Sequence, residues 1–305
     1  MRTLSGAVAV VTGAGSGIGR ALAVALAERG ADLALADVNE THLGETAELL
    51  PPGRKVTTHR VDVSKLDDMQ RFRDEVEREH GRVSLLVNNA GVALYGSFPD
   101  VSLEDLEWIM GINFWGVLYG CKLFLPLLLR EPEANIVNLS SIFGVISPPS
   151  QIGYCAAKFA VRGFSESLRH ELWLSSKVKL TVVHPGGVNT NIAATSRKGA
   201  FADAESLERD VKAFQRSLVK PPEEAAQDII GAVLKDKARL LIGRDAWLLD
   251  KIQRFFPSKY FYVMAPLLDP KGTLRRAAAR KRVADATTNG SMKHEHAGGH
   301  VKETA

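Results

Sequence analysis

Cysteine is nearly absent from this chain, with only Cys121 and Cys155 among its 305 residues. The two residues form no C-x-x-C pair, so neither a disulfide framework nor a zinc site of the finger type is expected. We therefore expect a reducing, cytoplasmic setting and no bound metal. Cys155 is interpreted as a small packing residue, because no neighbour in the sequence would obviously hold it as a thiolate.

An excess of charge of one sign is also missing. The formal net charge is +4, with 24% charged and 45% hydrophobic residues, which is the composition of an ordinary globular protein. The positive excess is concentrated in KGTLRRAAARKR, residues 271–282. We interpret this run as a solvated helix end or tail, with contact to anionic lipid or nucleic acid as the alternative.

Long apolar runs are limited to one stretch, WIMGINFWGVLYGCKLFLPLLL at 108–129. It has nearly the length of a membrane span. However, it contains Asn113, Lys122 and Pro126. A long helix buried against protein is therefore the better interpretation.

The sequence does contain a regular alternation of apolar strand patterns and helical patterns. The expected strands are 7–13, 31–37, 55–63, 83–91, 134–141, 179–187 and 238–243. The expected helices are 19–30, about 40–50, 64–81, 153–174 and the segment after Pro221 and Pro222. Ser64 and Asp67 have the spacing of a capping box at the start of one helix. Strand followed by helix, repeated, predicts an α/β fold with a parallel sheet.

No linker or internal repeat divides this pattern, so residues 1–245 are expected to form one domain. Residues 246–283 are apolar and aromatic, then basic, and form a predicted C-terminal extension. This extension could cap a pocket, pair subunits or rest on a membrane, and we favour a pocket or subunit contact. The polar tail 284–305 is expected to be disordered.

A glycine-rich stretch, TGAGSGIG at 12–19, follows the first strand and opens the first helix. Glycine allows a tight turn and a close approach of the backbone to a bound group, and the free N–H groups of a helix N-terminus suit a pyrophosphate. Asp37 ends the second strand, 18 residues after Gly19. An acid there can accept hydrogen bonds from an adenosine ribose and would repel a 2′-phosphate. The alternative is that Asp37 merely starts a turn, but the spacing favours the cofactor role. No Arg or Lys occurs in the loop before Ile18, and Val38 follows Asp37, which favours NAD over NADP.

Several further motifs occur in one order along the chain: NNAG at 88–91, Asn113, SS at 140–141, YCAAK at 154–158 and PG at 185–186. Together with TGAGSGIG they resemble the classical short-chain dehydrogenase/reductase family. The resemblance weakens beyond about residue 245. It implies a Rossmann-like, doubly wound, seven-stranded parallel sheet in a single domain with a C-terminal extension, and usually a homodimer or homotetramer.

The resemblance also implies the catalytic residues Asn113, Ser141, Tyr154 and Lys158. Tyr154 and Lys158 lie four residues apart, so they share a face of a helix. A neighbouring ammonium favours a phenolate and would bring the tyrosine closer to working pH as a base. Ser141 would hold the substrate oxygen, and Asn113 would steady a water that leads the proton from Lys158 to solvent. Ser140 is expected to be structural, and Asn88 or Asn89 could merely tie strands together.

The remaining matches are implied contacts of a nicotinamide cofactor, NAD rather than NADP. They are Gly13, Ser16, Gly17, Ile18, Gly19, Asp37, Asp62, Val63, Asn89, Ala90, Gly91, Tyr154, Lys158, Pro185, Gly186, Val188 and Thr190. The expected function is an NAD(H)-dependent oxidoreductase that interconverts a secondary alcohol, preferably lipophilic, and its ketone. Three rivals remain: an NADPH-dependent ketoreductase, a nicotinamide-binding regulatory or scaffold protein without turnover, and a lipid-surface protein that uses residues 247–282.

Overall fold

A computed structural model describes residues 1–201, 211–212 and 214–268 of the protein. The chain divides into two compact units, Met1–Lys251 and Ile252–Ala305. The first contains every predicted site residue. In the second, the described residues form the end of α9 (Arg244–Phe255) and α10 (Tyr260–Leu268). Our boundaries at residues 245 and 283 stay predictions, and the tail 284–305 lies outside the described residues.

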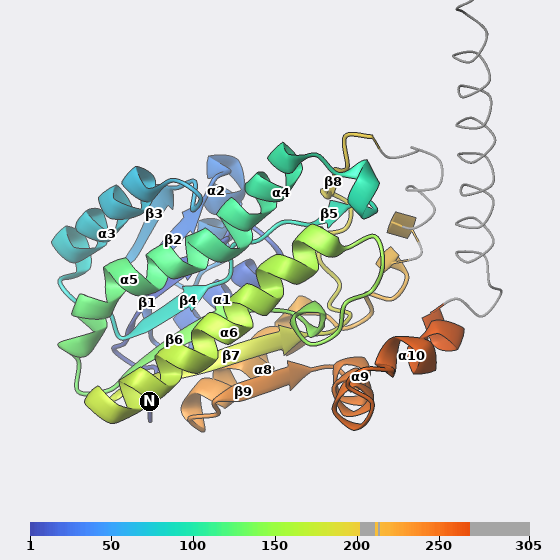
Figure 1. Ribbon diagram of the computed structural model, residues 1–305. Helices are drawn as coiled ribbons and strands as arrows, with labels where there is room; N and C mark the ends of the chain where they lie inside the picture. The colour runs from blue at the N-terminus through green and yellow to red at the C-terminus, as the bar shows by residue number, and fades with distance from the viewer. Residues whose placement is uncertain (202–210, 213, 269–305) are drawn as a thin grey trace, which may run out of the picture. The chain divides into compact units, whose positions relative to one another are not determined.

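Seven parallel strands form one sheet, in the order β3-β2-β1-β4-β6-β7-β9 (Figure 1). The chain starts in the middle of the sheet, runs outward to β3, returns to β4 and then continues to the other edge. This order confirms the prediction of a Rossmann-like doubly wound sheet. The strands are β1 (Val8–Thr12), β2 (Asp32–Asp37), β3 (Val56–Arg60), β4 (Leu85–Asn88), β6 (Ala134–Leu139), β7 (Val178–Pro185) and β9 (Arg239–Ile242).

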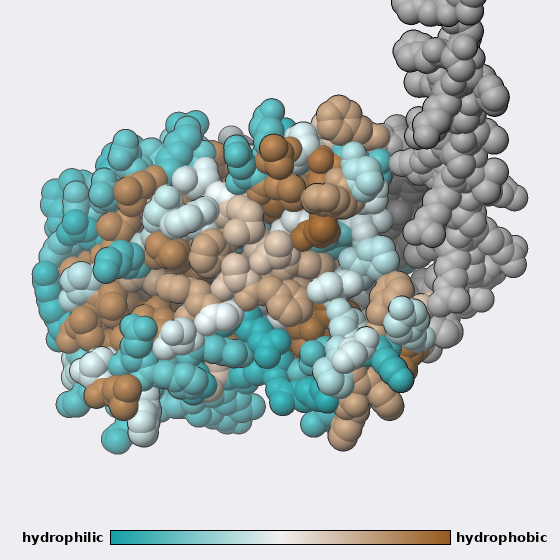
Figure 2. All heavy atoms as spheres, viewed as in Figure 1, coloured by the Kyte–Doolittle hydropathy of each residue, from teal (hydrophilic) through white to brown (hydrophobic). Residues whose placement is uncertain are grey.

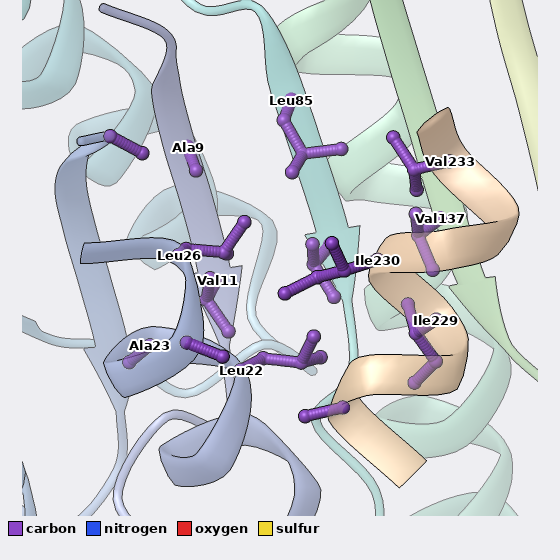
Figure 3. Close-up of a cluster of buried hydrophobic side chains, with 14 of the residues drawn as sticks. Ala9, Val11, Leu22, Ala23, Leu26, Leu85, Val137, Ile229, Ile230 and Val233 are labelled. Carbon is purple, nitrogen blue, oxygen red and sulfur yellow. The ribbon is translucent and has the colours of Figure 1, made fainter. Parts of the chain in front are cut away.

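Helices cover both faces of the sheet. On one face lie α1 (Gly17–Glu28), α2 (Glu40–Glu48) and α8 (Pro222–Leu234), and on the other α3 (Leu66–His80), α5 (Gly116–Leu129) and α6 (Ile152–Ser175). Figure 3 shows how apolar side chains of α1 and α8 meet strands β1, β4 and β6, which makes one continuous core on this face. The labelled members of this core are Ala9, Val11, Leu22, Ala23, Leu26, Leu85, Val137, Ile229, Ile230 and Val233.

One helical stretch, Leu103–Leu129, is long and apolar enough to cross a membrane by length and composition alone. It consists of α4 (Leu103–Met110), a π-helical turn η2 (Gly111–Trp115) and α5. In the fold, α5 packs against α3 and β4, and η2 packs against α6. The stretch is thus a helix that covers the sheet, as expected from its polar residues.

The predicted capping box at the start of α3 is wrong. Ser64 donates its hydroxyl to Asp62 Oδ1 at 2.6 Å, and the helix begins after Lys65 with no side-chain cap. A capping box forms instead at α4, where Ser102 and Asp105 bond reciprocally to each other's backbone N–H groups. The predicted end of α3 is correct, since Gly81 closes the helix with φ +73°.

Candidate active site

The glycine loop connects β1 to α1 at the carboxyl edge of the sheet. Gly17 has φ +52°, and a Cβ on it would stand 3.0 Å from Thr190 Cγ2. A Cβ on Gly19 would overlap the carbonyl oxygen of Gly13. Because α1 has no side-chain cap at Ser16, its first amide groups are left for water or a ligand. Loop and helix end therefore form a cradle that fits a pyrophosphate.

Asp37 lies beside this cradle, at the end of β2. Its Oδ2 accepts a hydrogen bond from the Gly15 N–H at 2.9 Å, and its Oδ1 accepts from Asn39 N–H at 3.0 Å. The nearest basic side chain, Arg20, bonds to the Gly15 carbonyl and forms an ion pair with Glu45 at 2.7 Å. The structure thus places a carboxylate next to the glycine loop, while the guanidinium at the loop is already paired.

The NNAG motif ties the two central strands together. Asn89 Nδ2 donates to the carbonyls of Thr12 and Gly13, at 3.0 Å each, and the Ala90 N–H donates to Thr12 Oγ1 at 3.1 Å. Asn88 is buried and donates to Asn138 Oδ1 at 2.8 Å. Both asparagines therefore join strands.

The structure gives Asp62 and Val63 local partners. The carboxylate of Asp62 accepts from both the N–H and the hydroxyl of Ser64. The side chain of Val63 is 7% exposed and lies in the core, where a Cβ on Gly116 would come within 2.8 Å of it. The predicted adenine contacts of Asp62 and Val63 stay predictions.

Asn113 sits in the π-helical turn between α4 and α5 and is fully buried. Its Oδ1 accepts from the Val92 N–H at 2.8 Å, and its Nδ2 donates to the Val92 carbonyl at 2.9 Å. The extra residue of a π-helical turn re-aims a side chain, and here it directs the amide at the loop after β4. Asn113 anchors that loop, and its expected contact with a water stays a prediction.

Ser141, Tyr154 and Lys158 come together from β6 and α6. A hydrogen bond joins Ser141 to the Tyr154 phenol. Lys158 Nζ lies 5.7 Å from the centre of the Tyr154 ring and donates to the Leu139 carbonyl at 2.9 Å. A Cβ on Gly91 would stand 3.4 Å from Lys158 Nζ and 3.3 Å from Asn113 Oδ1. The structure therefore brings together all four residues predicted to be catalytic.

Burial shifts the titration of this group. It raises the pKa of Tyr154 to about 12, although the hydrogen bond from Ser141 acts in the opposite direction. It also lowers the pKa of Lys158, which is 3% exposed, to about 8. Both shifts disfavour the charged form. In the protein without a cofactor, burial therefore outweighs the lowering of the Tyr154 pKa that we expected from Lys158; the second expected cause, the positive charge of an oxidised nicotinamide, stays a prediction.

Two residues that sequence reasoning missed hold the backbone of the site. His184 is fully buried, and its Nδ1 lies 3.0 Å from the Ser141 carbonyl oxygen. Asp245 accepts from the Gly187 N–H at 2.8 Å, and its carboxylate fills the space where Gly186 would carry a Cβ. Both contacts bridge segments far apart in the chain, so no short motif could reveal them.

The PG motif forms the far side of the cradle. Thr190 adjoins Gly17, while Val188 is 4% exposed and belongs to the core over α1 and α8. The predicted contacts of Thr190 and Val188 with a nicotinamide stay predictions. Pro185 ends β7 beside Gly186. Ser140 is structural as expected, because its hydroxyl donates to the Lys158 carbonyl at 2.8 Å.

Aromatic rings line the approach to Tyr154. The Phe143 ring meets the Tyr154 ring edge-on at 6.2 Å between centroids, and the Phe214 ring lies 5.9 Å from Phe143 and 5.9 Å from Tyr95. Val92 and Tyr154 pack against the small cluster that includes Leu94. Ile142 and Val145, on either side of this segment, are buried in the core.

Comparisons with known proteins agree with this geometry. The family model described as short chain dehydrogenase matches residues 7–200. A Mycobacterium tuberculosis protein named as an oxidoreductase, SadH, is 42% identical over 268 residues, which are 87% of this chain and 96% of that protein. Human epidermal retinol dehydrogenase 2 is 30% identical, over 88% of this chain and 84% of its own. A crystal structure of a Burkholderia phymatum short chain dehydrogenase/reductase in complex with NAD is 33% identical, with a TM-score of 0.78, and covers 84% of this chain and 96% of that chain.

Proposed function

The chain belongs to the short-chain dehydrogenase/reductase family of oxidoreductases, and from this membership we propose an NAD(H)-dependent enzyme that interconverts a lipophilic secondary alcohol and its ketone. One observation carries the proposal. The Tyr154 phenol, bonded to Ser141 and 5.7 Å from the Lys158 ammonium, lies at the sheet edge that also carries the glycine cradle and Asp37.

In the proposed reaction, Tyr154 takes the hydroxyl proton of the alcohol and Ser141 donates a hydrogen bond to the substrate oxygen as negative charge grows on it. The nicotinamide, when bound, supplies the acceptor for the hydride that leaves the carbinol carbon. Tyr154 must be ionised to act as the base, yet burial keeps its phenol neutral. Lys158, with a pKa of about 8, is still largely protonated at neutral pH and stands next to the ring. Its positive charge favours the phenolate. The positive charge of a bound, oxidised nicotinamide would favour it further and so offset the effect of burial on the phenol.

The choice of NAD over NADP is supported by Asp37 and Arg20. A carboxylate at the end of β2 accepts from ribose hydroxyls and repels a 2′-phosphate. Arg20 would be the natural partner of such a phosphate, but it is paired with Glu45. The Burkholderia structure in complex with NAD is consistent with this choice.

The lipophilic substrate is supported by what surrounds Tyr154. Phe143 places a ring beside the phenol, Phe214 packs against Phe143, and Val92 adds an aliphatic wall. Such walls favour an apolar substrate over a small polar diol. The retinol in the name of the human relative is an alcohol of this class.

The test follows NADH formation across secondary alcohols of graded size, from diols to steroids, with NAD⁺ and NADP⁺ in parallel. We expect turnover with NAD⁺ and a bulky apolar alcohol, and its loss in Tyr154→Phe while NADH still binds. A KM for NADP⁺ below that for NAD⁺ would favour the ketoreductase rival. Tight NADH binding without turnover on any alcohol or ketone would favour the scaffold rival.

A homodimer is part of the proposal. Figure 2 shows apolar residues gathered in a band over α5 and α6. Trp115 at the end of η2, Leu129 on α5 and Phe159 on α6 are large, apolar and 38–50% exposed. A contiguous face of this kind on two neighbouring helices suits a self-complementary contact. Light scattering of the purified chain should give twice the mass of 33.1 kDa, and a monomer at micromolar concentration would rule this contact out.

A further inference from the structure

Helix α9 has two different sides. Ala246 is fully buried and Asp250 is 4% exposed, and Asp250 binds Arg239 at 2.7 Å. These two residues are four apart, so they mark one side of the helix. The opposite side is exposed. We call it the α9 outer face; it consists of Arg244, Trp247, Leu248, Lys251, Arg254 and Phe255.

The α9 outer face is apolar and basic at once. Trp247 is 56% exposed, Leu248 49% and Phe255 76%. Trp247, Lys251 and Phe255 follow one another at intervals of four residues, and Lys251 Nζ lies 5.6 Å from the centre of the Trp247 ring. Arg244 and Arg254 lie beside them. A tryptophan with neighbouring lysines and arginines is the composition of helices that lie in a membrane interface.

The two acidic residues of α9 bind partners in the fold. Asp250 is paired with Arg239, and Asp245 accepts from the Gly187 N–H at 2.8 Å. Both carboxylates are thus used to hold α9 to the fold. The outer face therefore presents three basic residues and no acid.

The sequence after α9 also contains exposed aromatic residues, followed by basic residues. Phe256 is 49% exposed and Tyr262 is 70% exposed. Further on, residues 270–282, PKGTLRRAAARKR, contain six lysines and arginines and no acidic residue. Each basic residue near an anionic bilayer contributes about 1 kcal/mol of attraction.

We propose that the α9 outer face binds the surface of an anionic lipid bilayer, with Trp247, Leu248 and Phe255 entering the interface and the basic residues facing lipid phosphates. A second copy of the chain fits this face less well. In a two-fold contact the face would meet itself, so basic residues would oppose basic residues with no acid between them. The binding does not depend on catalysis and is measured without substrate.

The experiment is co-sedimentation of the full chain with vesicles of phosphatidylcholine alone or with added phosphatidylglycerol. We expect binding to the anionic vesicles, weakened by high salt because exposed charges are screened. The test variant is Trp247→Ser with Phe255→Ser. The matched control is Trp173→Ser with Leu174→Ser, which removes two apolar residues at the end of α6 that are 74% and 78% exposed. We expect at least about a tenfold lower partition for the test variant and little change for the control, because only the test variant loses apolar area that enters the interface.

A second variant, Lys251→Glu, keeps both aromatic residues and should also reduce binding to anionic vesicles. Thermal melts establish that each variant is folded. Equal partition of the test and control variants would overturn the proposal, as would equal binding to both kinds of vesicle. Wild type that ignores vesicles but self-associates through Trp247 and Phe255 would instead identify the face as a contact between copies.

Discussion

At the scale of single residues, two side chains hold the candidate site in place by bonding to backbone atoms of other residues. His184 contacts the carbonyl of Ser141, and Asp245 contacts the N–H of Gly187. Burial lowers the pKa of His184 to about 4, so its ring is neutral at working pH. A carbonyl can only accept, so Nδ1 carries the proton and donates it. His184 thereby holds Ser141 in place without touching the substrate.

Replacing His184 tests this positioning role. His184→Leu should lower kcat about tenfold or more while the KM for NAD⁺ changes little, since a lost hydrogen bond is worth about 1 kcal/mol and the unpaired carbonyl adds to it. His184→Asn should restore most of the rate, because its Nδ2 can take the place of Nδ1. The measurement is steady-state kinetics of the two variants. Equal losses in both would mean that His184 only fills space.

Lys158 makes a different prediction, for stability. Its pKa is lowered to about 8 by burial, from 10.5 in the unfolded chain. Below pH 8 Lys158 is protonated in both the folded and the unfolded state, so burial of its charge lowers the stability of the fold. Between pH 8 and 10.5 the unfolded state binds more protons than the folded state, so stability rises with pH and the penalty disappears.

Lys158→Met should therefore be inactive yet more stable than wild type at pH 7, by up to about 3 kcal/mol. The difference should shrink as the pH rises from 8 to 10.5. Urea unfolding at several pH values measures it. A variant that is less stable than wild type at pH 7 would show that the bond to the Leu139 carbonyl outweighs the cost of burial.

At the scale of elements, α4 is fixed at its first turn by one buried carboxylate. Asp105 is 1% exposed and completes the capping box with Ser102. It also accepts from the Ala200 N–H at 3.1 Å and pairs with Arg197 at 2.8 Å. Arg197 belongs to β8 (Arg197–Lys198). This strand pairs with β5 (Leu94–Tyr95), which comes shortly after the NNAG motif. One carboxylate thus joins a helix start to the segment that follows Thr190.

Asp105→Ala should lower the free energy of unfolding by about 3 kcal/mol, because a helix cap and a partly buried ion pair are lost together. Asp105→Asn keeps an acceptor for the cap and loses only the charge, so it should cost clearly less. Urea unfolding of both variants compares them. If both cost the same, the ion pair rather than the cap dominates.

The elements themselves were largely predictable, and their details were not. Strand β1 is a short apolar run, and burial on both faces of a parallel sheet requires that pattern. The start of α3 was misplaced because Ser64 has the closer acceptor Asp62, which competes with capping. The π-helical turn at Asn113 has no periodicity signal of its own, since its backbone departs from the helix by a single residue.

At the scale of the whole molecule, the sheet order brings distant motifs to one edge. Gly17 and Thr190 come from widely separated parts of the sequence and adjoin each other at the cradle. The family resemblance predicted that they lie close together, because the carboxyl ends of parallel strands meet at one edge of the sheet. The contacts of His184 and Asp245 could not be predicted in this way. Each side chain bonds to a backbone atom, and a backbone atom of this kind is present whatever the residue type.

NAD⁺ should stabilise the folded protein as a whole. A ligand bound only by the native state adds about 2.7 kcal/mol at a concentration 100 times its Kd. Tyr154→Phe should keep this shift, since the cradle is intact. Gly17→Val should lose it, because valine disfavours φ +52° and would press on Thr190. Thermal melts with and without NAD⁺ measure both. A shift that persists in Gly17→Val would mean that the nucleotide binds elsewhere.

The order of the strands also determines when the sheet can form during synthesis of the chain. A growing chain emerges from its N-terminus, and β1 is made first yet lies in the centre of the finished sheet. Its neighbour β4 arrives only some seventy residues later, and the wall formed by Thr190 only after β7. Until β4 has been made, the chain therefore carries the glycine loop on a strand with one unpaired edge. The cradle is complete only after Thr190 has been made, so a nucleotide that binds there would bind only after β1 is paired on both sides.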